Sequence, residues 1–135
     1  MEKKNIDWSS IGFAYMPTDY RYVSNFKDGK WDEGTLSTDP NIVLNECAGV
    51  LQYSQSVFEG LKAYTTEDGH IVTFRPDLNA ERMAASAARL EMPVFPKERF
   101  IDAVEQVVKA NAAWVPPYGS GATLYLRPYM FGSNA

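Results

Sequence analysis

The pattern of hydrophobic and polar residues divides the chain into short extended segments and two longer helical ones. Aromatic and β-branched residues predict strands in four segments, at residues 20–26, 61–64, 71–74 and 122–131. Apolar residues at helical spacing predict one helix at 76–90 and a second from Pro96 to residues 111–114. Residues 47–58 also have helical spacing, although this segment is the least decidable from pattern alone.

Asp-Gly pairs mark two tight turns between extended segments. One pair, at 28–29, follows the first predicted strand, and the other, at 68–69, joins the second strand to the third. Residues 33–41 carry glycine, aspartate and proline and are predicted to form a loop. Pro128 restricts the last strand to an edge position or a strand end. The order of elements predicts an α+β fold, with two helices packed on a mostly antiparallel sheet.

Composition and charge fit one domain with a hydrophobic core. Of the 135 residues, 45% are hydrophobic and 22% are charged, which is ordinary for a globular domain. Acidic residues number 17 and basic ones 13, and this net negative charge argues against a general nucleic-acid binder. No apolar run approaches the roughly 20 residues of a membrane span, and no secretory signal follows Lys3 and Lys4. We therefore expect a cytoplasmic protein with neither a membrane nor a nucleic-acid partner.

Few residues offer metal or nucleophilic chemistry. The single histidine, His70, lies at the second predicted turn and does not favour a Ser-His-Asp or Cys-His arrangement. No cluster of cysteine and histidine has zinc-ligand spacing, so no metal site is predicted. The single cysteine, Cys47, excludes an internal disulfide and favours a reducing compartment. We expect its side chain to be a small buried hydrophobic group.

Two arginines are candidate anion ligands. In the segment 124–127, strand alternation directs the two leucines to the core and places Tyr125 and Arg127 together on the opposite face. There, a phenol and a guanidinium could receive a carboxylate. Arg82 lies near the middle of the first predicted helix and could bind a phosphate. Pattern alone favours the ordinary alternatives, which are a solvated strand face and a surface arginine in a local ion pair.

Aromatic residues cluster in sequence around one glycine. Tyr53, Phe58 and Tyr64 flank Gly60 at a spacing that suits the wall of a pocket, although aromatic side chains more often fill a core. The glycine indicates a turn or a close approach of the backbone to another group. The pattern therefore leaves open whether these residues line a site or pack inside the fold.

Four segments, in order, resemble the branched-chain aminotransferases. The matching segments are Leu51–Tyr64, which contains Phe-Glu-Gly-Leu-Lys, then Phe74–Met83 with Ser86–Leu90, then Trp114–Pro117, and finally Leu124–Pro128. Each segment alone is a weak signal, but their shared order over residues 20–132 is specific. Ser54 stands where many members of this family have glycine, and some members also have serine there.

The resemblance implies the small N-terminal domain of an aminotransferase of fold type IV, which depends on pyridoxal 5'-phosphate (PLP). It divides the chain into an N-terminal extension (1–19), the small domain (20–132) and the start of an interdomain linker (133–135). A large C-terminal domain would then be absent from these residues. Members of the family are homodimers, so a second subunit and the missing domain are the expected protein partners.

The implied activity moves the amino group of leucine, isoleucine or valine to 2-oxoglutarate, with glutamate and 2-oxo acids as the other small-molecule partners. Arg82 matches the arginine that contacts the PLP phosphate. Phe58 matches an aromatic wall of the substrate pocket, and Tyr53 matches a tyrosine that reaches into the site of the partner subunit. Tyr125 and Arg127 match the pair near the substrate carboxylates.

The resemblance also implies that the isolated chain is inactive. The Schiff-base lysine of these enzymes, which also transfers the proton, belongs to the C-terminal domain. No lysine of this chain lies in a matching context, so no catalytic residue is assigned, and Lys62 matches a basic position whose role is left open. Two alternatives remain. One is a sister enzyme of the same fold, a D-amino acid aminotransferase or an aminodeoxychorismate lyase, and the other is a non-catalytic binding or dimerisation module.

Overall fold

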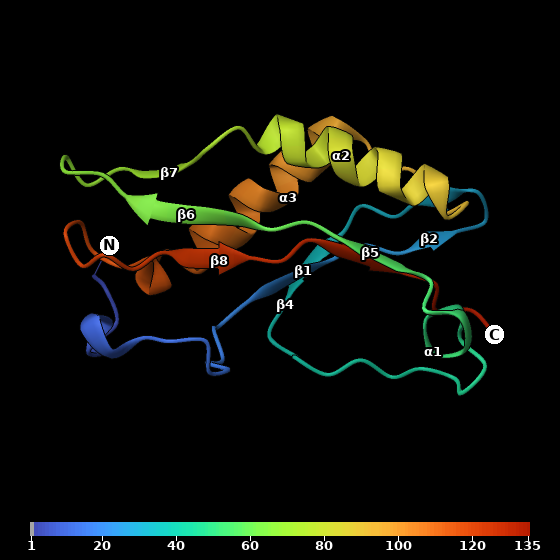
Figure 1. The fold of residues 1–135 in the computed structure, drawn as a ribbon, viewed down its shortest axis with the longest axis horizontal. Coiled ribbons are helices and arrows are strands. Elements are labelled where there is room, and N and C mark those ends of the chain that lie inside the picture. Colours follow the sequence, from blue (N-terminus) through green and yellow to red (C-terminus); the bar gives the residue numbers. More distant parts are fainter. Residues whose placement is uncertain (1) are drawn as a thin grey trace.

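The computed structural model describes residues 2–135, and it confirms the α+β fold (Figure 1). The helices are α1 (Gly49–Tyr53), α2 (Pro76–Arg89) and α3 (Lys97–Ala110), with 3-10 turns at Trp8–Ser10 and Ala112–Trp114. The strands, which all pair antiparallel, are β1 (Arg21–Val23), β2 (Phe26–Lys27), β3 (Lys30–Trp31), β4 (Thr35–Ser37), β5 (Ser56–Phe58), β6 (Leu61–Thr65), β7 (Ile71–Thr73), β8 (Leu124–Leu126) and β9 (Tyr129–Phe131). Met1, the first residue of the expected N-terminal extension, lies outside the described residues.

Both predicted helices and both predicted tight turns are confirmed. α2 begins at Pro76, and α3 begins directly after Pro96. The β2–β3 hairpin turns through Asp28 and Gly29, which both have positive φ, as a type I′ turn requires. The second turn joins β6 to β7. These elements could be predicted because each depends on residues close together in the sequence, a proline at a helix start or an Asp-Gly pair in a turn.

One long antiparallel ladder with a local break forms the centre of the fold. β5 pairs with β9 and β6 pairs with β8 in the same register, which places Glu59 opposite Pro128 and Gly60 opposite Arg127. The Glu59 amide donates a hydrogen bond to the Pro128 carbonyl at 2.8 Å. Proline has no amide hydrogen to return this bond, so the ladder is interrupted there. The single strand predicted at 122–131 is therefore wrong, because it is two strands that Pro128 separates.

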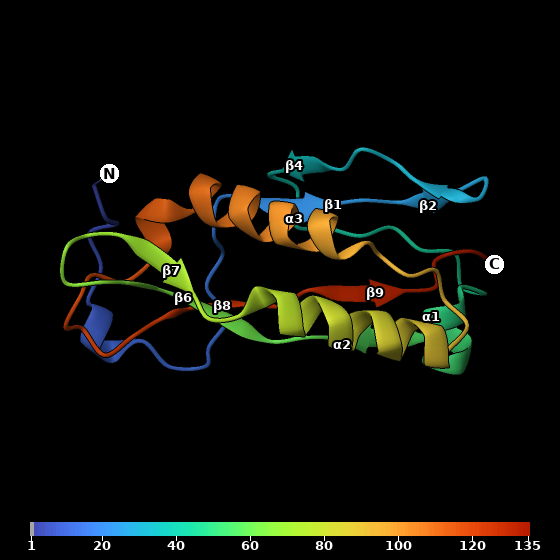
Figure 2. The ribbon, with the colours of Figure 1, turned by 90° about the horizontal axis from the view of Figure 1, so that it is seen from above.

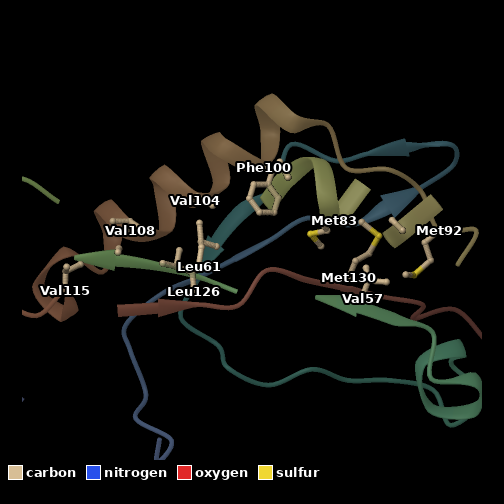
Figure 3. Packing of buried hydrophobic residues seen from close by; sticks show 13 residues of the cluster. Val57, Leu61, Met83, Met92, Phe100, Val104, Val108, Val115, Leu126 and Met130 are labelled. Atoms are coloured by element: carbon tan, nitrogen blue, oxygen red, sulfur yellow. The ribbon is translucent and has the colours of Figure 1, made fainter. Parts of the chain in front are cut away.

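The two long helices lie side by side over one face of this ladder (Figure 2). Between β5 and the end of β6, buried side chains alternate with exposed ones, as the period of a strand requires. The buried side chains face the helices and form the core (Figure 3). The core residues are Val57, Leu61, Ala63, Ala80, Met83, Ala87, Met92, Phe100, Val104, Val108, Val115, Leu126 and Met130. We call this the inner face of the ladder, and the opposite, exposed face its outer face.

The helix predicted over residues 47–58 is wrong in its second half. α1 ends at Tyr53, and Ser54 adopts a left-handed conformation with a φ of 54°. The chain then enters β5, where pairing with β9 buries Val57. A pairing with a strand more than 70 residues away thus overrides the local helical spacing.

Two further expectations are corrected by the structure. The loop predicted at 33–41 contains β4, whose three residues form a strand because they pair with β1. Their own sequence pattern does not indicate this partner. Cys47 is exposed, not buried, because it precedes α1 in a surface segment. Within residues 2–135, no helix is both long enough and apolar enough to cross a membrane.

A buried asparagine at the end of α3 fixes the chain before β1. Asn111 Oδ1 accepts hydrogen bonds from the amides of Asp19 (3.1 Å) and Tyr20 (2.9 Å). Asn111 Nδ2 donates to the carbonyls of Tyr20 (2.9 Å) and Val107 (2.8 Å). All four hydrogen-bonding positions of the amide are thereby used. The Asn111 side chain therefore links the segment that leads into β1 to the end of α3.

Candidate functional site

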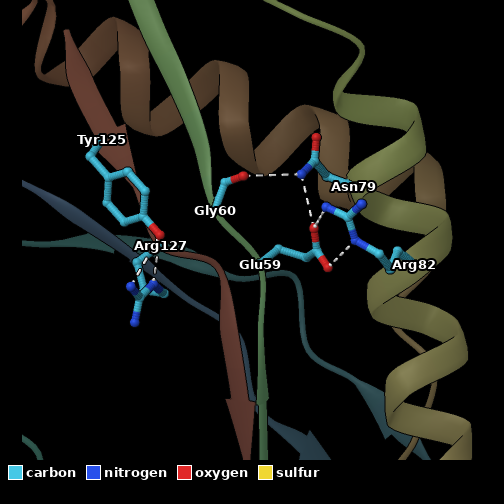
Figure 4. Close-up of polar contacts among 6 residues, drawn as sticks. All are labelled: Glu59, Gly60, Asn79, Arg82, Tyr125 and Arg127. Atoms are coloured by element: carbon cyan, nitrogen blue, oxygen red, sulfur yellow. Dashed lines mark hydrogen bonds and ion pairs between the residues drawn. The ribbon is translucent and has the colours of Figure 1, made fainter.

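Residues 58–60, at the break in the ladder, lie alternately on its outer and inner faces. The exposed fraction is 60% for Phe58, which lies on the outer face, and 5% for Glu59, which lies on the inner face. Gly60 belongs to the outer face again. Strand alternation accounts for this arrangement. As a result, one short segment contributes to two polar clusters on opposite sides of the ladder (Figure 4).

The outer-face cluster consists of Phe58, Tyr125 and Arg127. Arg127 Nε and Nη2 donate to the Tyr125 hydroxyl oxygen at 3.1 and 3.0 Å. Arg127 Cζ also lies 4.3 Å from the ring centroid of Phe58, which is within the range of a cation–π interaction. Among residues 2–135, no group accepts a hydrogen bond from Arg127 Nη1. This exposed guanidinium can therefore still receive an external carboxylate.

Gly60 leaves the space into which Tyr125 extends. A Cβ atom at residue 60 would lie 3.0 Å from Tyr125 Cζ and closer still to the hydroxyl oxygen. Such approaches are rare for real Cβ atoms, so a larger residue would displace the phenol. The close approach that the sequence indicates at Gly60 is thus made by the Tyr125 side chain.

The inner-face cluster consists of Glu59, Asn79 and Arg82. Glu59 Oε2 accepts a hydrogen bond from Arg82 Nε at 2.8 Å, and Oε1 accepts one from Arg82 Nη2 at 2.5 Å. Oε1 also accepts one from Asn79 Nδ2 at 2.9 Å. The bonds from Arg82, with a contribution from Asn79, hold the pKa of the Glu59 carboxyl below its ordinary value, although burial opposes this shift. The same pairing raises the pKa of Arg82.

Asn79 also satisfies a backbone group that the sheet leaves without a partner. Its Nδ2 donates to the Gly60 carbonyl at 3.2 Å. β7 pairs with β6 only opposite residues 63–65, so Gly60 lies beyond the end of β7 and needs a donor from elsewhere. Asn79 is itself buried, and it therefore joins α2 rigidly to the break in the ladder.

The residues predicted from sequence to form a site lie in three places. Phe58, Tyr125 and Arg127 are in contact on the outer face. Arg82 is on α2, on the inner side, where it is exposed and pairs with Glu59 of the strand segment, 23 residues away, and not with a near neighbour on its own helix. Tyr53 is 84% exposed at the end of α1 and lines a surface hollow with Leu90. Within residues 2–135, neither Arg82 nor Tyr53 forms a hydrogen bond or a cation–π contact with the outer-face cluster.

Sequence reasoning missed Glu59 and Asn79. The signal for Glu59 was present, because alternation places it on the same buried face as Val57 and Leu61, and a charge at such a position requires a partner. No comparable signal identifies Asn79, whose role depends on how α2 lies over the strand. Lys62 lies opposite Tyr125 in the ladder and is exposed on the outer face. The structure of residues 2–135 contains no group of three or more acidic, histidine or cysteine side chains that could hold a metal ion.

The fold of this chain is similar to part of several solved branched-chain aminotransferases. The enzyme of Escherichia coli superposes on 87% of this chain with a TM-score of 0.64, at 24% sequence identity and over 33% of its own length. The enzyme of Thermoproteus uzoniensis, solved with norvaline, superposes on 84% of this chain with a TM-score of 0.59, at 25% identity and over 34% of its length. A further enzyme of this name, complexed with N-(5'-phosphopyridoxyl)-L-glutamate, superposes on 75% of this chain with a TM-score of 0.61, at 28% identity and over 32% of its length.

Sequence relatives agree with the fold. The branched-chain-amino-acid aminotransferase of Haemophilus influenzae is 55% identical over 129 residues, which are 96% of this chain and 38% of that protein. That of Helicobacter pylori is 45% identical over the same shares of both chains. A methionine aminotransferase of Arabidopsis thaliana is 48% identical over 96% of this chain and 37% of its own length. No protein-family model matches the chain.

By sequence and fold, the chain is similar to the N-terminal portion of the branched-chain aminotransferases. It spans little more than a third of the length of the curated relatives that it matches.

Proposed function

We propose that this chain is part of a PLP-dependent transaminase that moves the amino group of leucine, isoleucine or valine to 2-oxoglutarate. Residues 1–19 are assigned to an N-terminal extension, 20–132 to the small domain and 133–135 to the start of a linker. The remaining length of the relatives would hold the large domain. Sequence identity of 55% over 96% of the chain to the branched-chain-amino-acid aminotransferase of Haemophilus influenzae supports the proposal.

The outer-face cluster is the observation that carries the proposal. A substrate of this class has an apolar side chain or a distal carboxylate, and the site must accept either one. Phe58 offers an exposed aromatic surface, while Arg127 offers donors for a carboxylate within the same contact. Tyr125 holds the guanidinium through two hydrogen bonds. In this proposal, Phe58 contacts the apolar chain, and Tyr125 with Arg127 orients the carboxylate.

Arg82 has the properties that a phosphate ligand requires. Its side chain is 66% exposed, and among residues 2–135 no group accepts a hydrogen bond from Nη1. We assign to it the binding of the cofactor phosphate, for which a guanidinium is well suited. When bound, PLP supplies the electron sink for chemistry at the amino-acid α-carbon. The residues of this chain would bind and orient the reactants, and they would not transfer the proton.

The lysine that binds the cofactor covalently would come from the large domain. Lys62 lies opposite Tyr125 on the outer face, but its sequence context matches a different position of the family. The isolated chain is therefore proposed to be inactive. Tyr53, which is exposed and away from the outer-face cluster, is assigned to the site of a partner subunit in a homodimer.

Other interpretations make different predictions for substrates. The relative named as a methionine aminotransferase favours methionine as a further amino donor to test. A sister enzyme of this fold would act on D-alanine or aminodeoxychorismate instead. A non-catalytic binding or dimerisation module would show no turnover even when the remaining domain is present.

The proposal is tested with two samples. The 135-residue chain is mixed with PLP, reduced with borohydride and analysed by mass spectrometry, and leucine–2-oxoglutarate transamination is assayed in the same sample. We expect neither a stoichiometric lysine label nor turnover. The full-length protein that contains this segment should show both, with leucine preferred over D-alanine and aminodeoxychorismate. Turnover by the 135-residue chain alone would refute the assignment of the lysine to another domain.

A further inference from the structure

The two halves of the Glu59–Arg82 ion pair lie in very different surroundings. The Glu59 side chain is 5% exposed and the Arg82 side chain is 66% exposed. An apolar residue at position 59 would continue the buried row of Val57 and Leu61. Replacing a buried ion pair with apolar residues is often neutral or stabilising. Stability alone therefore gives no reason for a glutamate at this position.

The geometry of the pair separates the donors of Arg82 into two groups. A guanidinium has five N–H donors in one plane. Glu59 receives the edge formed by Nε and Nη2, and among residues 2–135 no group accepts a hydrogen bond from Nη1. Because the carboxylate is fixed by burial and by Asn79, the bidentate contact fixes the plane of the guanidinium. The donors that remain have a defined direction on an exposed side chain.

We propose that Glu59 is a positioning residue, whose buried carboxylate orients Arg82 so that its free Nη1 edge meets the phosphate of a bound ligand. This inference rests on the proposed function, in which Arg82 binds the cofactor phosphate. An arginine that is already ordered loses less conformational freedom when the ligand binds. The advantage of glutamate over an apolar residue at position 59 is therefore in affinity for the phosphate group.

The same network reaches the outer face of the ladder. Asn79 donates both to Glu59 and to the carbonyl of Gly60, over which the Tyr125 side chain extends. Residues 58–60 thus set the position of Arg82 through one face and of Tyr125 through the other. The phosphate-binding and carboxylate-binding groups are held relative to one another by a single strand segment.

Glu59 has two effects on an anion, and their signs are opposite. Its negative charge weakens the attraction of Arg82 for a phosphate, whereas its hold on the guanidinium favours binding. Glu59→Gln retains the shape of the side chain and removes the charge. If charge were the only effect, this variant would bind phosphate more tightly. A positioning role predicts weaker binding, so the direction of the change separates the two.

The experiment compares PLP with pyridoxal, which lacks the phosphate, on the apo-form of the full-length protein that contains this segment. The dissociation constant of pyridoxal divided by that of PLP isolates the contribution of the phosphate, and a high ratio means a strong preference for PLP. Arg82→Met should lower this preference for PLP about tenfold or more, and Glu59→Gln should lower it roughly three- to tenfold. Asp77→Asn is the matched control, because it removes the charge of the Arg75–Asp77 ion pair (2.8 Å) at the start of the same helix. It should leave the ratio unchanged.

The outcomes distinguish the two proposals. A lower ratio in Arg82→Met with an unchanged or higher ratio in Glu59→Gln overturns the positioning role and leaves the role of Arg82 intact. An unchanged ratio in Arg82→Met overturns the proposed function of Arg82 itself. If Glu59→Gln does not fold, Glu59→Asp, which keeps the charge and shortens the side chain, must lower the ratio. A general loss of structure would weaken the binding of both ligands equally, so it cannot produce the lower ratio that the positioning role predicts.

Discussion

The Tyr125 hydroxyl lies where a side chain at Gly60 would have to be, and the same hydroxyl accepts both hydrogen bonds from Arg127. Gly60 lies directly opposite Arg127 in the ladder, so Tyr125 is its diagonal neighbour. The absence of a side chain at residue 60 therefore decides where the phenol lies, and the phenol decides where the guanidinium lies. Gly60 shapes the outer-face cluster through the space that it leaves.

Gly60→Ala should destabilise the chain by about 1–3 kcal/mol in urea unfolding, because the added methyl group overpacks the contact with Tyr125. Gly12→Ala is the control, since nothing lies within 4 Å of a Cβ at that residue, and it should be neutral or slightly stabilising. Adding Tyr125→Phe to Gly60→Ala removes the hydroxyl that makes the closest contact. The double variant should recover part of the loss, and a double variant with no recovery would contradict this account.

The elements that could be predicted from sequence are those whose cause is local. A proline at or just before the first helical position and an Asp-Gly pair between extended segments act over a few residues, and α2, α3 and both tight turns are confirmed. β4 and β5 could not be predicted, because each becomes a strand only through a distant partner. The break at Pro128 was indicated by the missing amide, but its place opposite Glu59 requires the register.

In the candidate site too, the local arrangement could be predicted from sequence and the long-range contact could not. Strand alternation placed Tyr125 and Arg127 on one face, and the structure brings them into contact. The partner of Arg82 could not be identified, because the contact spans 23 residues and depends on how α2 crosses the ladder. Glu59 was nevertheless detectable as a charge in a buried row, and this pattern is a signal worth seeking in other strands.

Glu91 closes α2 in a backbone conformation that favours glycine. Its φ is 57°, its amide donates to the Ala88 carbonyl at 3.1 Å, and the Met92 amide donates to the Ala87 carbonyl at 2.8 Å. This is the bonding of a Schellman motif, in which glycine usually occupies the left-handed position. Glu91→Gly should therefore stabilise the chain by about 0.5–1 kcal/mol in thermal or urea unfolding.

The control for Glu91→Gly is the same exchange inside a helix. Glu98 lies in the first turn of α3, where glycine has no conformational advantage and should destabilise by about 1 kcal/mol. Opposite signs for the two exchanges support the assignment of the left-handed cap. Loss of stability at both positions would show that the φ of Glu91 carries no cost.

Replacing Asn111 should destabilise the fold more than replacing an exposed polar residue does. Asn111→Ala removes four hydrogen bonds at a site with 3% exposure and leaves the amides of Asp19 and Tyr20 without their acceptor. We expect a loss of about 2–4 kcal/mol in urea unfolding. Asn5→Ala, at an exposed position, should change stability by less than about 0.5 kcal/mol. Similar values for the two variants would rule out the proposed anchoring of the segment before β1.

Acid should weaken the contribution of Glu59. Folding lowers the pKa of this carboxyl from its ordinary value of 4.5, chiefly through the hydrogen bonds from Arg82. The stabilisation is therefore complete above that ordinary value and is lost as the pH falls through the lowered one. The stability difference between the wild-type chain and Glu59→Gln should be largest near neutral pH and should shrink on acidification. Urea unfolding at several pH values measures it, and a difference that stays constant down to about pH 3 would refute the assignment.

Arg127 should distinguish the two amino donors of the proposed reaction. In the full-length protein, Arg127→Leu removes the donors that would receive the distal carboxylate of glutamate but leaves Phe58 to contact an apolar side chain. Loss of a hydrogen-bonded charge pair predicts a fall in kcat/KM of about tenfold or more for glutamate, against about threefold or less for leucine. Steady-state assays with both donors measure the two ratios on one preparation, so misfolding lowers both together. Equal losses for glutamate and leucine would place the carboxylate elsewhere and assign Arg127 to the structure of the outer face alone.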